Sequence, residues 1–516
     1  MEYGHETKRV YTSLLRDANH PNNPDNFTQP LTVYSPESPI STPSIMHTFS
    51  QSDTPEIEED TQSVSESSTE STVDWVPLYD LLSSTEIEEA EEFMHAFFDE
   101  YVHMYALDMK SPKFREEMEA ELALQLYTQW SECGICDSHH IAELEEWVHT
   151  QAELLFSVFP ARSYVAGQPT PIVPEPNMES ILATLTAYPQ PKQRTSEWYA
   201  FRNNLITASS VWKVFGTESQ RNSLIYEKCA AMAESGDTDD MHISSSHSLG
   251  AATGQNPMQW GAKYEPVSAA IYERRNATKL GEFGCIAHPQ YPYLGASPDG
   301  INVDPTNPDK YGRMVEIKNI VNREITGEPL EAYWIQMQIQ MEVCGLNACD
   351  FVETRFREFD GPDAFFDKSR CDTEKGIILY FLPKFRAGES AQSAAEYVYC
   401  PLELTLGEDF SAVYAWIRGE TGARPHSILY HTVYWYLAEF SCVLVLRNPE
   451  WFAAAQPHIA ELWQTVEKER EEGYDHRAAK RRAKPQTEVV CEDNTDTQYI
   501  RNLPKQRSVC LVKLEG

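Results

Sequence analysis

The sequence predicts a mixed α/β (α+β) protein, in which a central mixed sheet is flanked by helices and a separate helical unit comes first. Short apolar runs, some of them alternating with charged residues, predict strands. Longer stretches with apolar residues at helical spacing predict helices, and one of these lies between predicted strands. The predicted strands are 301–303, 314–319, 351–356 and 376–382, and the predicted helices are 85–105, 114–130, 141–159 and 330–346.

The size and charge of the chain limit its function. Its 516 residues suffice for two ordered units, and a hydrophobic content of 41% can build a sizeable core. The net charge of −37 opposes binding to a polyanion such as DNA. However, residues 1–100 contain 21 acidic and three basic residues, whereas residues 190–360 contain 22 acidic and 16 basic residues. The central region is therefore only weakly acidic, and bound metal would neutralise several of its carboxylates.

The first 75 residues are rich in Ser, Thr, Pro, Asp and Glu and show no apolar periodicity. Such a segment cannot bury enough surface to offset the entropy lost on ordering, so we expect a disordered acidic tail. The part from Ser50 to Thr72 is either a solubilising tail or a phosphorylatable segment that competes electrostatically with DNA.

The lack of a membrane span and of a signal peptide, together with the cysteine usage, predicts a soluble, intracellular protein. No apolar run approaches the roughly 18 residues of a membrane span, and the N-terminus lacks the apolar centre of a signal peptide. Eleven scattered cysteines indicate reduced thiols and not a disulfide framework. The basic run from Arg477 to Lys484 suits a nuclear import signal, a DNA-backbone contact or a solvated helix end, so nucleus and cytoplasm both remain open.

Residues 82–159 have the pattern of a small helical unit. We interpret Thr85-x-x-Glu88 as the capping box of its first helix. A loop between the later helices holds four potential zinc ligands within eight residues, namely Cys133, Cys136, His139 and His140. Because structural zinc sites normally join two separated ligand pairs, a loop with free thiols is the alternative interpretation.

A proline-rich linker at 160–191 leads to the predicted catalytic domain at 192–470, which is followed by a basic, flexible tail at 471–516. The C-terminal part of this domain is predicted to be rich in helices, with an aromatic cluster around Tyr430 to Phe440. The segment from Arg194 to Ser209 predicts a short helix and then a second helix capped by Thr207 or Ser209. A helix N-terminus with a hydroxyl and a guanidinium, here Arg202, suits phosphate binding. The alternative is an ordinary capped helix with Arg202 on its surface.

The main functional signal is a predicted hairpin that ends at Lys318. Residues 314–319 alternate apolar and polar side chains, so Glu316 and Lys318 share one face of the strand. Asp299 lies in the turn sequence Ser-Pro-Asp-Gly, just before another short apolar run. A hairpin would therefore bring the Asp299 carboxylate beside Glu316.

Two carboxylates and a lysine at one point suit metal-assisted phosphodiester hydrolysis. Carboxylate oxygens are hard ligands that suit Mg²⁺ or Mn²⁺, and substrate phosphates and water complete the shell of such an ion. The lysine ammonium cannot be a ligand, but it could orient an attacking water and offset charge on a phosphoryl group. The alternative is a surface hairpin with a solvated Glu/Lys pair.

Two predicted helices supply further polar candidates. Glu265 lies at the start of a helix predicted from Pro266 to Arg275, where the helix dipole favours an acid even without a function; the alternative is a third metal-facing carboxylate. Gln336 and Gln340 share a face of the helix at 330–346, whereas Gln338 points elsewhere. Glutamine on an apolar helix is costly if it is buried unpaired, so these residues indicate a polar cleft.

Together these motifs resemble the YqaJ-type viral recombinase family, of which phage lambda exonuclease is the familiar member, within the PD-(D/E)XK nuclease superfamily. Herpesvirus alkaline nucleases are similar at a greater distance. The resemblance implies a restriction-endonuclease-like core with a mixed central sheet. It spans about residues 190–360, where five motifs follow the family's order: Arg194 to Ser209 (with Trp198), MQWGAKYE, GASPDG, EIK and YWIQMQ.

The resemblance implies cleavage of DNA with Mg²⁺ or Mn²⁺, two ions in all, and degradation of one strand from a duplex end in the 5′ to 3′ direction. It implies that Asp299, Glu316 and Glu265 are metal ligands, that Lys318 positions the attacking water and that Gln336 supports this shell. Arg202 and Ser209 match the positions that hold the 5′-phosphate, with Arg194 and Trp198 in the same DNA-binding motif.

The leading hypothesis is an exonuclease that acts on double-stranded DNA ends in viral-type recombination or genome processing, with a single-strand annealing protein as a partner. A homo-oligomer is compatible with the resemblance, although the insertion at 304–312 departs from the phage pattern. The alternatives are an endonuclease, a nuclease that also cuts RNA, or an inactive scaffold that binds DNA ends. The presence of all four metal-site residues together argues against the scaffold, namely Asp299, Glu265, Glu316 and Lys318.

Overall fold

The computed structural model describes residues 76–159, 162–164, 177–191, 195–234, 257–367, 374–384, 395–405 and 410–478. The predicted disordered tail, Arg194 and the basic run from Lys480 to Lys484 lie outside these residues. None of the helices in the described ranges is both long enough and apolar enough to cross a membrane.

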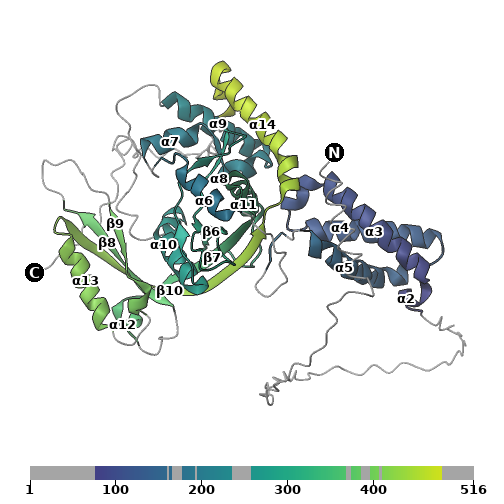
Figure 1. Cartoon of the computed structure of the whole chain (residues 1–516), viewed down its shortest axis with the longest axis horizontal. Coiled ribbons are helices and arrows are strands. Elements are labelled where there is room, and N and C mark those ends of the chain that lie inside the picture. The colour runs from purple at the N-terminus through teal and green to yellow at the C-terminus, as the bar shows by residue number, and fades with distance from the viewer. Residues whose placement is uncertain are drawn as a thin grey trace, which may run out of the picture. The chain divides into compact units, whose positions relative to one another are not determined.

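A group of helices comes first in the described chain, as predicted (Figure 1). The capping box of the first long helix is formed by Ser83 and Glu86: the Ser83 N–H donates to Glu86 Oε2 at 2.7 Å and the Glu86 N–H donates to Ser83 Oγ at 3.3 Å. The predicted box at Thr85 and Glu88 was wrong, because the helix begins at Ser84 and Thr85 is already inside it. This group consists of α2 (Leu78–Leu81), α3 (Ser84–Met104), α4 (Phe114–Glu132) and α5 (Ile141–Val158).

The central sheet is mixed, which confirms the predicted fold class. Its strand order is β2-β5-β6-β7-β10-β8-β9, with β6 and β7 parallel and every other neighbouring pair antiparallel. A smaller sheet has the order β1-β4-β3. The strands are β1 (Ile206–Thr207), β2 (Leu280–Gly281), β3 (Ile286–Ala287), β4 (Leu294–Ala296), β5 (Gly300–Asn302), β6 (Met314–Asn319), β7 (Ala348–Glu358), β8 (Lys375–Pro383), β9 (Glu396–Tyr399) and β10 (Ser427–Leu446).

Strand β10 is 20 residues long and joins two parts of the sheet (Figure 1). Its first half pairs with β8 and its second half with β7, and the register shifts after Leu429 and after Leu437. The helices Ser411–Ala423 and Pro449–Glu472 confirm that the C-terminal part is rich in helices, but the prediction was wrong for the aromatic cluster, which lies in a strand. The segment is rich in aromatic and β-branched residues, which fit a pleated surface, and bulges let so long a strand bend.

Two of the later helices differ from the prediction, since α6 lies inside the predicted linker at 160–191 and α10 begins early. Helix α10 begins at Pro257, nine residues before the predicted start, so Glu265 lies in mid-helix and Pro266 is inside the helix. That prediction took Pro266 for the first helical residue, where proline is common. The later helices are α6 (Met178–Ala187), α7 (Ser196–Asn203), α8 (Ala208–Val211), α9 (Glu218–Glu234), α10 (Pro257–Asn276), α11 (Glu331–Cys344), α12 (Pro362–Phe365), α13 (Ser411–Ala423) and α14 (Pro449–Glu472).

The two faces of β6 and β7 pack against different helices. On one face, Val315 and Ile317 form a buried cluster with Tyr272 of α10. On the other face, Phe351 of β7 belongs to the main core together with the apolar residues of α11. Because successive strand residues alternate between faces, Glu316 and Lys318 point toward α11.

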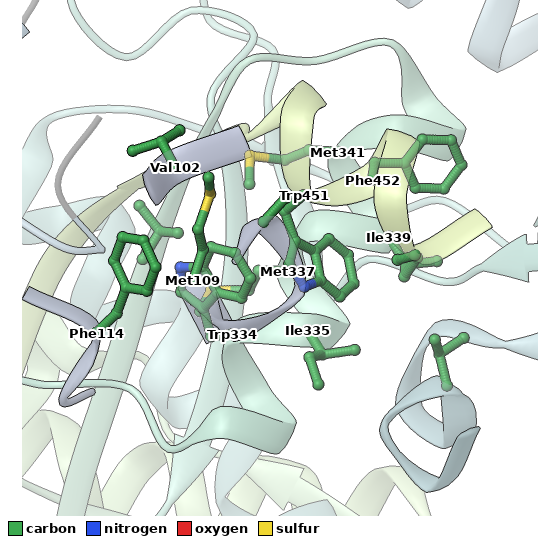
Figure 2. Close-up of a cluster of buried hydrophobic side chains, with 14 of the residues drawn as sticks. Val102, Met109, Phe114, Trp334, Ile335, Met337, Ile339, Met341, Trp451 and Phe452 are labelled. Atoms are coloured by element: carbon green, nitrogen blue, oxygen red, sulfur yellow. The ribbon is translucent and has the colours of Figure 1, made fainter. Parts of the chain in front are cut away.

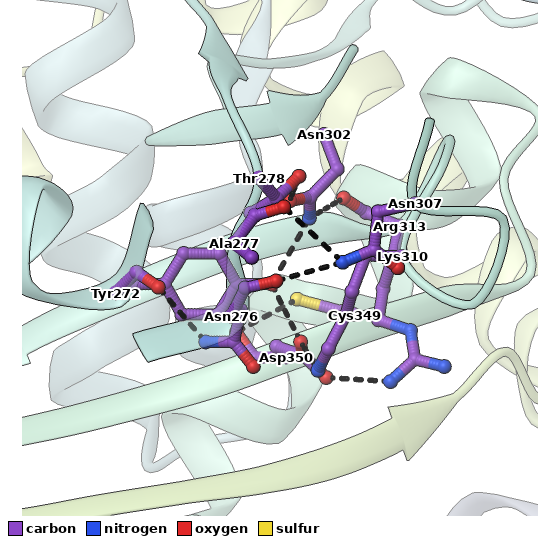
Figure 3. A network of polar contacts seen from close by, with 10 residues as sticks. All are labelled: Tyr272, Asn276, Ala277, Thr278, Asn302, Asn307, Lys310, Arg313, Cys349 and Asp350. Atoms are coloured by element: carbon purple, nitrogen blue, oxygen red, sulfur yellow. Dashed lines mark hydrogen bonds and ion pairs between the residues drawn. The ribbon is translucent and has the colours of Figure 1, made fainter. Parts of the chain in front are cut away.

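On the α10 face, a polar network holds the 304–312 loop (Figure 3). The buried Asp350 of β7 accepts hydrogen bonds from Tyr272 Oη at 2.6 Å and Lys310 Nζ at 2.5 Å, and Arg313 Nη1 lies 3.1 Å from its other oxygen. A buried carboxylate is costly unless it is paired and hydrogen-bonded, and these three donors satisfy both conditions. The insertion is therefore anchored to the sheet by Lys310.

The main core joins the N-terminal helices to the sheet region (Figure 2). Val102, Met109 and Phe114 pack in one cluster with Trp334 of α11 and Trp451 of α14. Polar contacts accompany this packing, since Trp334 Nε1 donates to the Arg162 carbonyl at 3.2 Å. The N-terminal helices thus share a hydrophobic core with the helices that support the candidate site.

Candidate active site

The predicted hairpin is present and positions Asp299 against β6. Strand β5 pairs antiparallel with β6, with Gly300 opposite Val315. The Asp299 Oδ2 atom accepts a hydrogen bond from the Ile317 backbone N–H at 2.7 Å. This bond fixes the carboxylate at the middle of the strand that carries Glu316 and Lys318.

Glu316 is fully buried, and three side chains donate to it. Lys318 Nζ forms a close ion pair with Oε1, which also accepts from Gln336 Nε2 at 2.7 Å. Gln340 Nε2 donates to Oε2 at 2.8 Å. This arrangement compensates a carboxylate that could not otherwise remain charged in the interior.

The glutamines of α11 divide as the sequence predicted. Gln336 and Gln340 both face Glu316, whereas Gln338 donates to the Leu446 carbonyl at 2.9 Å and accepts from the Asn448 N–H at 2.7 Å. We had placed Gln340 on the right face but had not counted it among the site residues. Its spacing of one helical turn from Gln336 was the available signal.

The charged groups of the site shift the pKa values of Asp299 and Lys318. Burial, followed by the charges of Glu316 and Glu265, raises the pKa of Asp299 well above its usual value, although Lys318 opposes this shift. For Lys318, burial acts to lower the pKa, but the attraction of Glu316 and Asp299 outweighs it and the pKa rises. Lys318 therefore stays positively charged. A further cation near Asp299 and Glu316 would stabilise the charged form of both carboxylates.

The donor chemistry of this site fits a hydrated divalent cation. Asp299 and Glu316 offer carboxylate oxygens, the ligand type that Mg²⁺ and Mn²⁺ prefer. Gln340 Oε1 is buried and has no hydrogen-bond partner among the described residues, so it could accept from a metal-bound water. Glu265 is exposed on α10 and acts on Asp299 by its charge. Throughout the described residues, no group of three or more His, Cys, Asp or Glu side chains is placed to hold a metal ion.

The residues predicted to bind a phosphate lie on α7 and α8, where Thr207 is the N-cap residue of α8, as expected. Arg202 Nη1 donates to Ser297 Oγ at 3.3 Å, and its guanidinium lies 4.4 Å from the centre of the Trp198 ring. Ser209 is exposed, and its hydroxyl lies 3.3 Å from Thr207 Oγ1. The Arg202 side chain thus contacts Ser297 and Trp198 and is held beside the β4–β5 connection.

Ser297 connects these residues to the carboxylates, and sequence reasoning missed it. Its hydroxyl accepts from Arg202, and its carbonyl accepts from Gln340 Nε2 at 3.3 Å. The same Gln340 amide group contacts Glu316. Ser297 lies two residues before Asp299 in the Ser-Pro-Asp-Gly turn, so its position in that motif was the available signal.

The four predicted zinc ligands do not converge. Cys133 is exposed, whereas Cys136 is buried and its thiol faces the Tyr127 carbonyl at 3.9 Å. His140 uses both ring nitrogens, with Nε2 3.0 Å from the Val76 carbonyl oxygen and Nδ1 accepting from the Asp137 N–H at 3.2 Å. This geometry matches the alternative interpretation, a loop between helices with free thiols.

About half of this chain is similar in sequence to a known viral protein. An uncharacterized protein of Acanthamoeba polyphaga mimivirus is 25% identical over 318 residues, which cover 55% of this chain and 54% of that protein. The match thus spans about half the length of this curated relative.

Solved structures of two proteins are similar to part of this chain. The alkaline exonuclease LHK-Exo of Laribacter hongkongensis shares 20% identity over 54% of this chain and 95% of its own, with a TM-score of 0.31. A phage-related exonuclease from Haemophilus somnus shares 11% identity over 52% of this chain and 96% of its own, with a TM-score of 0.27.

The family comparison covers the residues of the hairpin site. The matched segment, residues 197–347, includes Glu265, Asp299, Glu316 and Lys318. It agrees with the resemblance drawn from the sequence motifs, since residues 197–347 match the model of the YqaJ-like viral recombinase domain.

Proposed function

We propose that this protein is a metal-dependent deoxyribonuclease that degrades one strand of double-stranded DNA from its end, in the 5′ to 3′ direction. The observation that carries this proposal is the convergence of Asp299, Glu316 and Lys318 on one strand hairpin, inside a matched YqaJ-like domain. Two carboxylates beside a charged lysine suit hydrolysis of a phosphodiester. The names of the similar exonucleases support the same class of reaction.

Asp299 and Glu316 would hold Mg²⁺ or Mn²⁺, and two bound ions would stabilise the attacking and leaving oxygens. Glu265 would be a further ligand on the basis of the resemblance of the sequence motifs alone. Side chains of the protein would orient the Glu316 carboxylate and position the attacking water. Gln336 and Gln340 orient the Glu316 carboxylate through their amide groups. Lys318 would hold the attacking water and offset negative charge that develops on the phosphoryl group.

The direction of digestion rests on Arg202 and Ser209. A guanidinium can bind a phosphate bidentately, and hydroxyls with nearby backbone N–H groups can complete the contact. Arg202 is tied through Ser297 and Gln340 to the carboxylates, so a phosphate bound there would lie near the hydrolytic centre. A terminal 5′-phosphate at this position would select the strand that begins with it.

The test is digestion of linear duplexes labelled at either end, with and without a 5′-phosphate, in Mg²⁺ or in EDTA. We expect nucleotides to be released from the 5′ end, faster from a phosphorylated end and only in the presence of metal. Covalently closed circular DNA and duplex RNA should resist. Cutting of circular DNA or of RNA would support the endonuclease or RNA-cutting alternatives, and binding without cleavage would support the scaffold.

The biological role that we propose is end resection in viral-type recombination or genome processing. The support is the family of the matched domain and the mimivirus relative. A resected end is a single strand, so a protein that anneals single strands is the expected partner.

A further inference from the structure

A further buried carboxylate lies beside the candidate active site and has no part in the proposed reaction. Glu353 of β7 is fully buried, and in the parallel pairing of β6 and β7 it is the partner of Lys318. Its Oε1 atom forms a close ion pair with Arg323. Its Oε2 atom has no hydrogen-bond partner within the described part of the chain.

Arg323 is held in place but keeps its charge near the surface. Its side chain is 28% exposed, while that of Glu353 is 0% exposed. Its Nη1 atom donates to the Glu324 carbonyl at 3.0 Å, and its own carbonyl accepts from Arg355 Nη2 at 2.5 Å. The pair therefore presents the guanidinium outward and keeps the carboxylate inside.

Arg323 and Lys318 lie against the same aromatic ring. The Tyr333 ring centre is 4.9 Å from Lys318 Nζ and 5.5 Å from Arg323 Cζ. The two positive charges are thus no farther apart than these two distances combined. Successive phosphates of one strand are about 3.4 Å apart along the duplex axis. Lys318 and Arg323 are therefore close enough to face neighbouring phosphates of one strand.

The candidate site is acidic, so an outward-facing cation would reduce its repulsion of a nucleic acid. Asp299, Glu316 and Glu265 are acidic and repel a phosphodiester, and Lys318 is already paired with Glu316. A guanidinium has five N–H donors in a planar fork, so a contact with Glu353 leaves donors for a phosphate. Glu353 itself is too deeply buried to meet the DNA.

We propose that Arg323 binds a backbone phosphate of the DNA strand next to the phosphate that is hydrolysed, and that Glu353 positions Arg323 for this contact. The inference rests on the proposed function, because it needs DNA in the site. Arg323 would be a substrate-binding residue, and Glu353 a positioning residue that acts only through it. The competing interpretation is that Arg323 merely neutralises a buried carboxylate.

A double variant separates the two interpretations. Arg323→Ala alone would leave Glu353 buried and unpaired, which could unfold the protein for reasons unrelated to DNA. Arg323→Ala with Glu353→Gln removes both charges, so the buried site no longer needs a cation. Arg313→Ala with Asp350→Asn is the matched control, because this pair lies on the opposite face of the sheet, with a carboxylate 1% exposed and an arginine 23% exposed.

The measurement is affinity for a short 5′-phosphorylated duplex, in Ca²⁺ in place of Mg²⁺ to limit cleavage. Phosphates on either side of the first scissile linkage are replaced one at a time by neutral methylphosphonates. At one position we expect the neutral linkage to weaken binding by wild type and by the Arg313/Asp350 control about ten- to hundredfold, the effect of losing one charge-assisted contact. The same replacement should have no further effect on the Arg323/Glu353 variant.

Salt dependence is the second readout. The slope of log affinity against log salt should become shallower by about 0.9 in the Arg323/Glu353 variant, as expected for one lost phosphate contact. Glu353→Gln alone, which keeps the arginine but loosens it, should weaken the methylphosphonate effect without abolishing it.

The outcomes distinguish this inference from the proposed function. If the folded double variant responds to every methylphosphonate as wild type does and keeps its salt slope, Arg323 is only a structural ion-pair partner. If wild type neither binds nor cuts duplex ends in the labelled-end assay, the proposed function itself fails and Arg323 has no DNA to bind.

Discussion

At the scale of single residues, Glu316 is the most tightly constrained group of the candidate site. A fully buried carboxylate is stable only when donors surround it, and Lys318, Gln336 and Gln340 supply them. Lys318 and the two glutamines come from different elements, so the geometry of Glu316 depends on both the strand and the helix. Changes to these residues should therefore lower the stability of the fold as well as slow catalysis.

Lys318→Ala should reduce hydrolysis at least about a hundredfold, because one well-placed electrostatic group typically contributes that much. DNA binding should persist, since Arg202 and the rest of the domain remain. Single-turnover cleavage and equilibrium binding measure the two effects separately. Lys279→Ala is the control, because this lysine is 72% exposed and its ion-pair partner is Glu273 of α10 and not a carboxylate of the candidate site. Cleavage by Lys318→Ala within a few-fold of wild type would rule out the proposed role.

Asp299→Asn should change stability in opposite directions without and with Mg²⁺. The folded protein raises the pKa of Asp299, so without metal its charged form costs stability above the ordinary carboxylate pKa. In EDTA near neutral pH the variant should melt at a higher temperature than wild type, and this gain should shrink as pH falls through the raised pKa. Added Mg²⁺ should stabilise wild type more than the variant, because binding to the folded state adds stability. If Mg²⁺ raised the melting temperature of both proteins equally, this would contradict a metal site at Asp299.

Arg202→Ala should abolish the preference for a 5′-phosphorylated end. A charge-assisted contact contributes roughly 1.5–3 kcal/mol, or about a ten- to hundredfold effect on rate with a short duplex. Cleavage of 5′-hydroxyl ends should change much less. The control is Arg424→Ala, since Arg424 pairs with Glu396 of the edge strand β9 and with Glu420 of α13. Equal wild-type rates on both kinds of 5′ end would remove the basis for the assigned direction.

At the scale of elements, α11 is the helix that supports the site. Its apolar residues lie in the main core, and Gln336 and Gln340 face Glu316. The helix ends at Gly345, which adopts a left-handed φ of 65° as the residue after Cys344. Glycine is favoured there because a side chain is strained in this conformation.

Gly345→Ala should destabilise the protein by roughly 1–2 kcal/mol through backbone strain alone, because no atom would contact the new methyl group within 4 Å. Gly419→Ala is the matched substitution, since it also meets nothing within 4 Å but lies inside α13. It should stabilise by about 0.5–1 kcal/mol, because glycine is a poor helix former. Urea denaturation of both variants measures the difference, and a shift of the same sign in both would contradict the strain argument.

At the scale of the whole molecule, the N-terminal helices and the region of the central sheet are packed together. Met109 lies in the main core, and its sulfur accepts a hydrogen bond from Asn448 Nδ2 at 3.1 Å, at the start of α14. Helix α14 also contacts α11, so the N-terminal helices indirectly support the helix that carries Gln336. The stability of the site should depend on these helices.

Two truncations test this dependence. Removing residues 1–75 should leave thermal stability and cleavage intact, and DNA affinity at low salt should rise slightly because 13 acidic and three basic residues are lost. Removing residues 1–164 should lower the melting temperature strongly, since each large apolar side chain lost from the core contributes roughly 1.5–3 kcal/mol. Thermal melts of both proteins decide the matter. A marked loss of stability in the shorter truncation would show that residues 1–75 are structural.

Local pattern alone determined the central part of the site. Strand alternation placed Glu316 and Lys318 on one face, the turn sequence placed Asp299 beside them, and helical spacing separated Gln338 from its two neighbouring glutamines. These predictions succeeded because side-chain direction within one strand or helix depends on residues only a few positions apart.

Tertiary structure decided what depends on residues distant in the sequence. The long strand β10 forms because β7 and β8 offer edges on both sides, and Glu265 lies in mid-helix because α10 continues across Pro266. Ser297 links Arg202 to Gln340, and Arg323 pairs with Glu353, across many residues of chain. No local periodicity encodes such contacts, because they arise only when strands pair and helices pack on them. The sequence therefore determined which groups could carry out the chemistry, and the packing decided which of them meet.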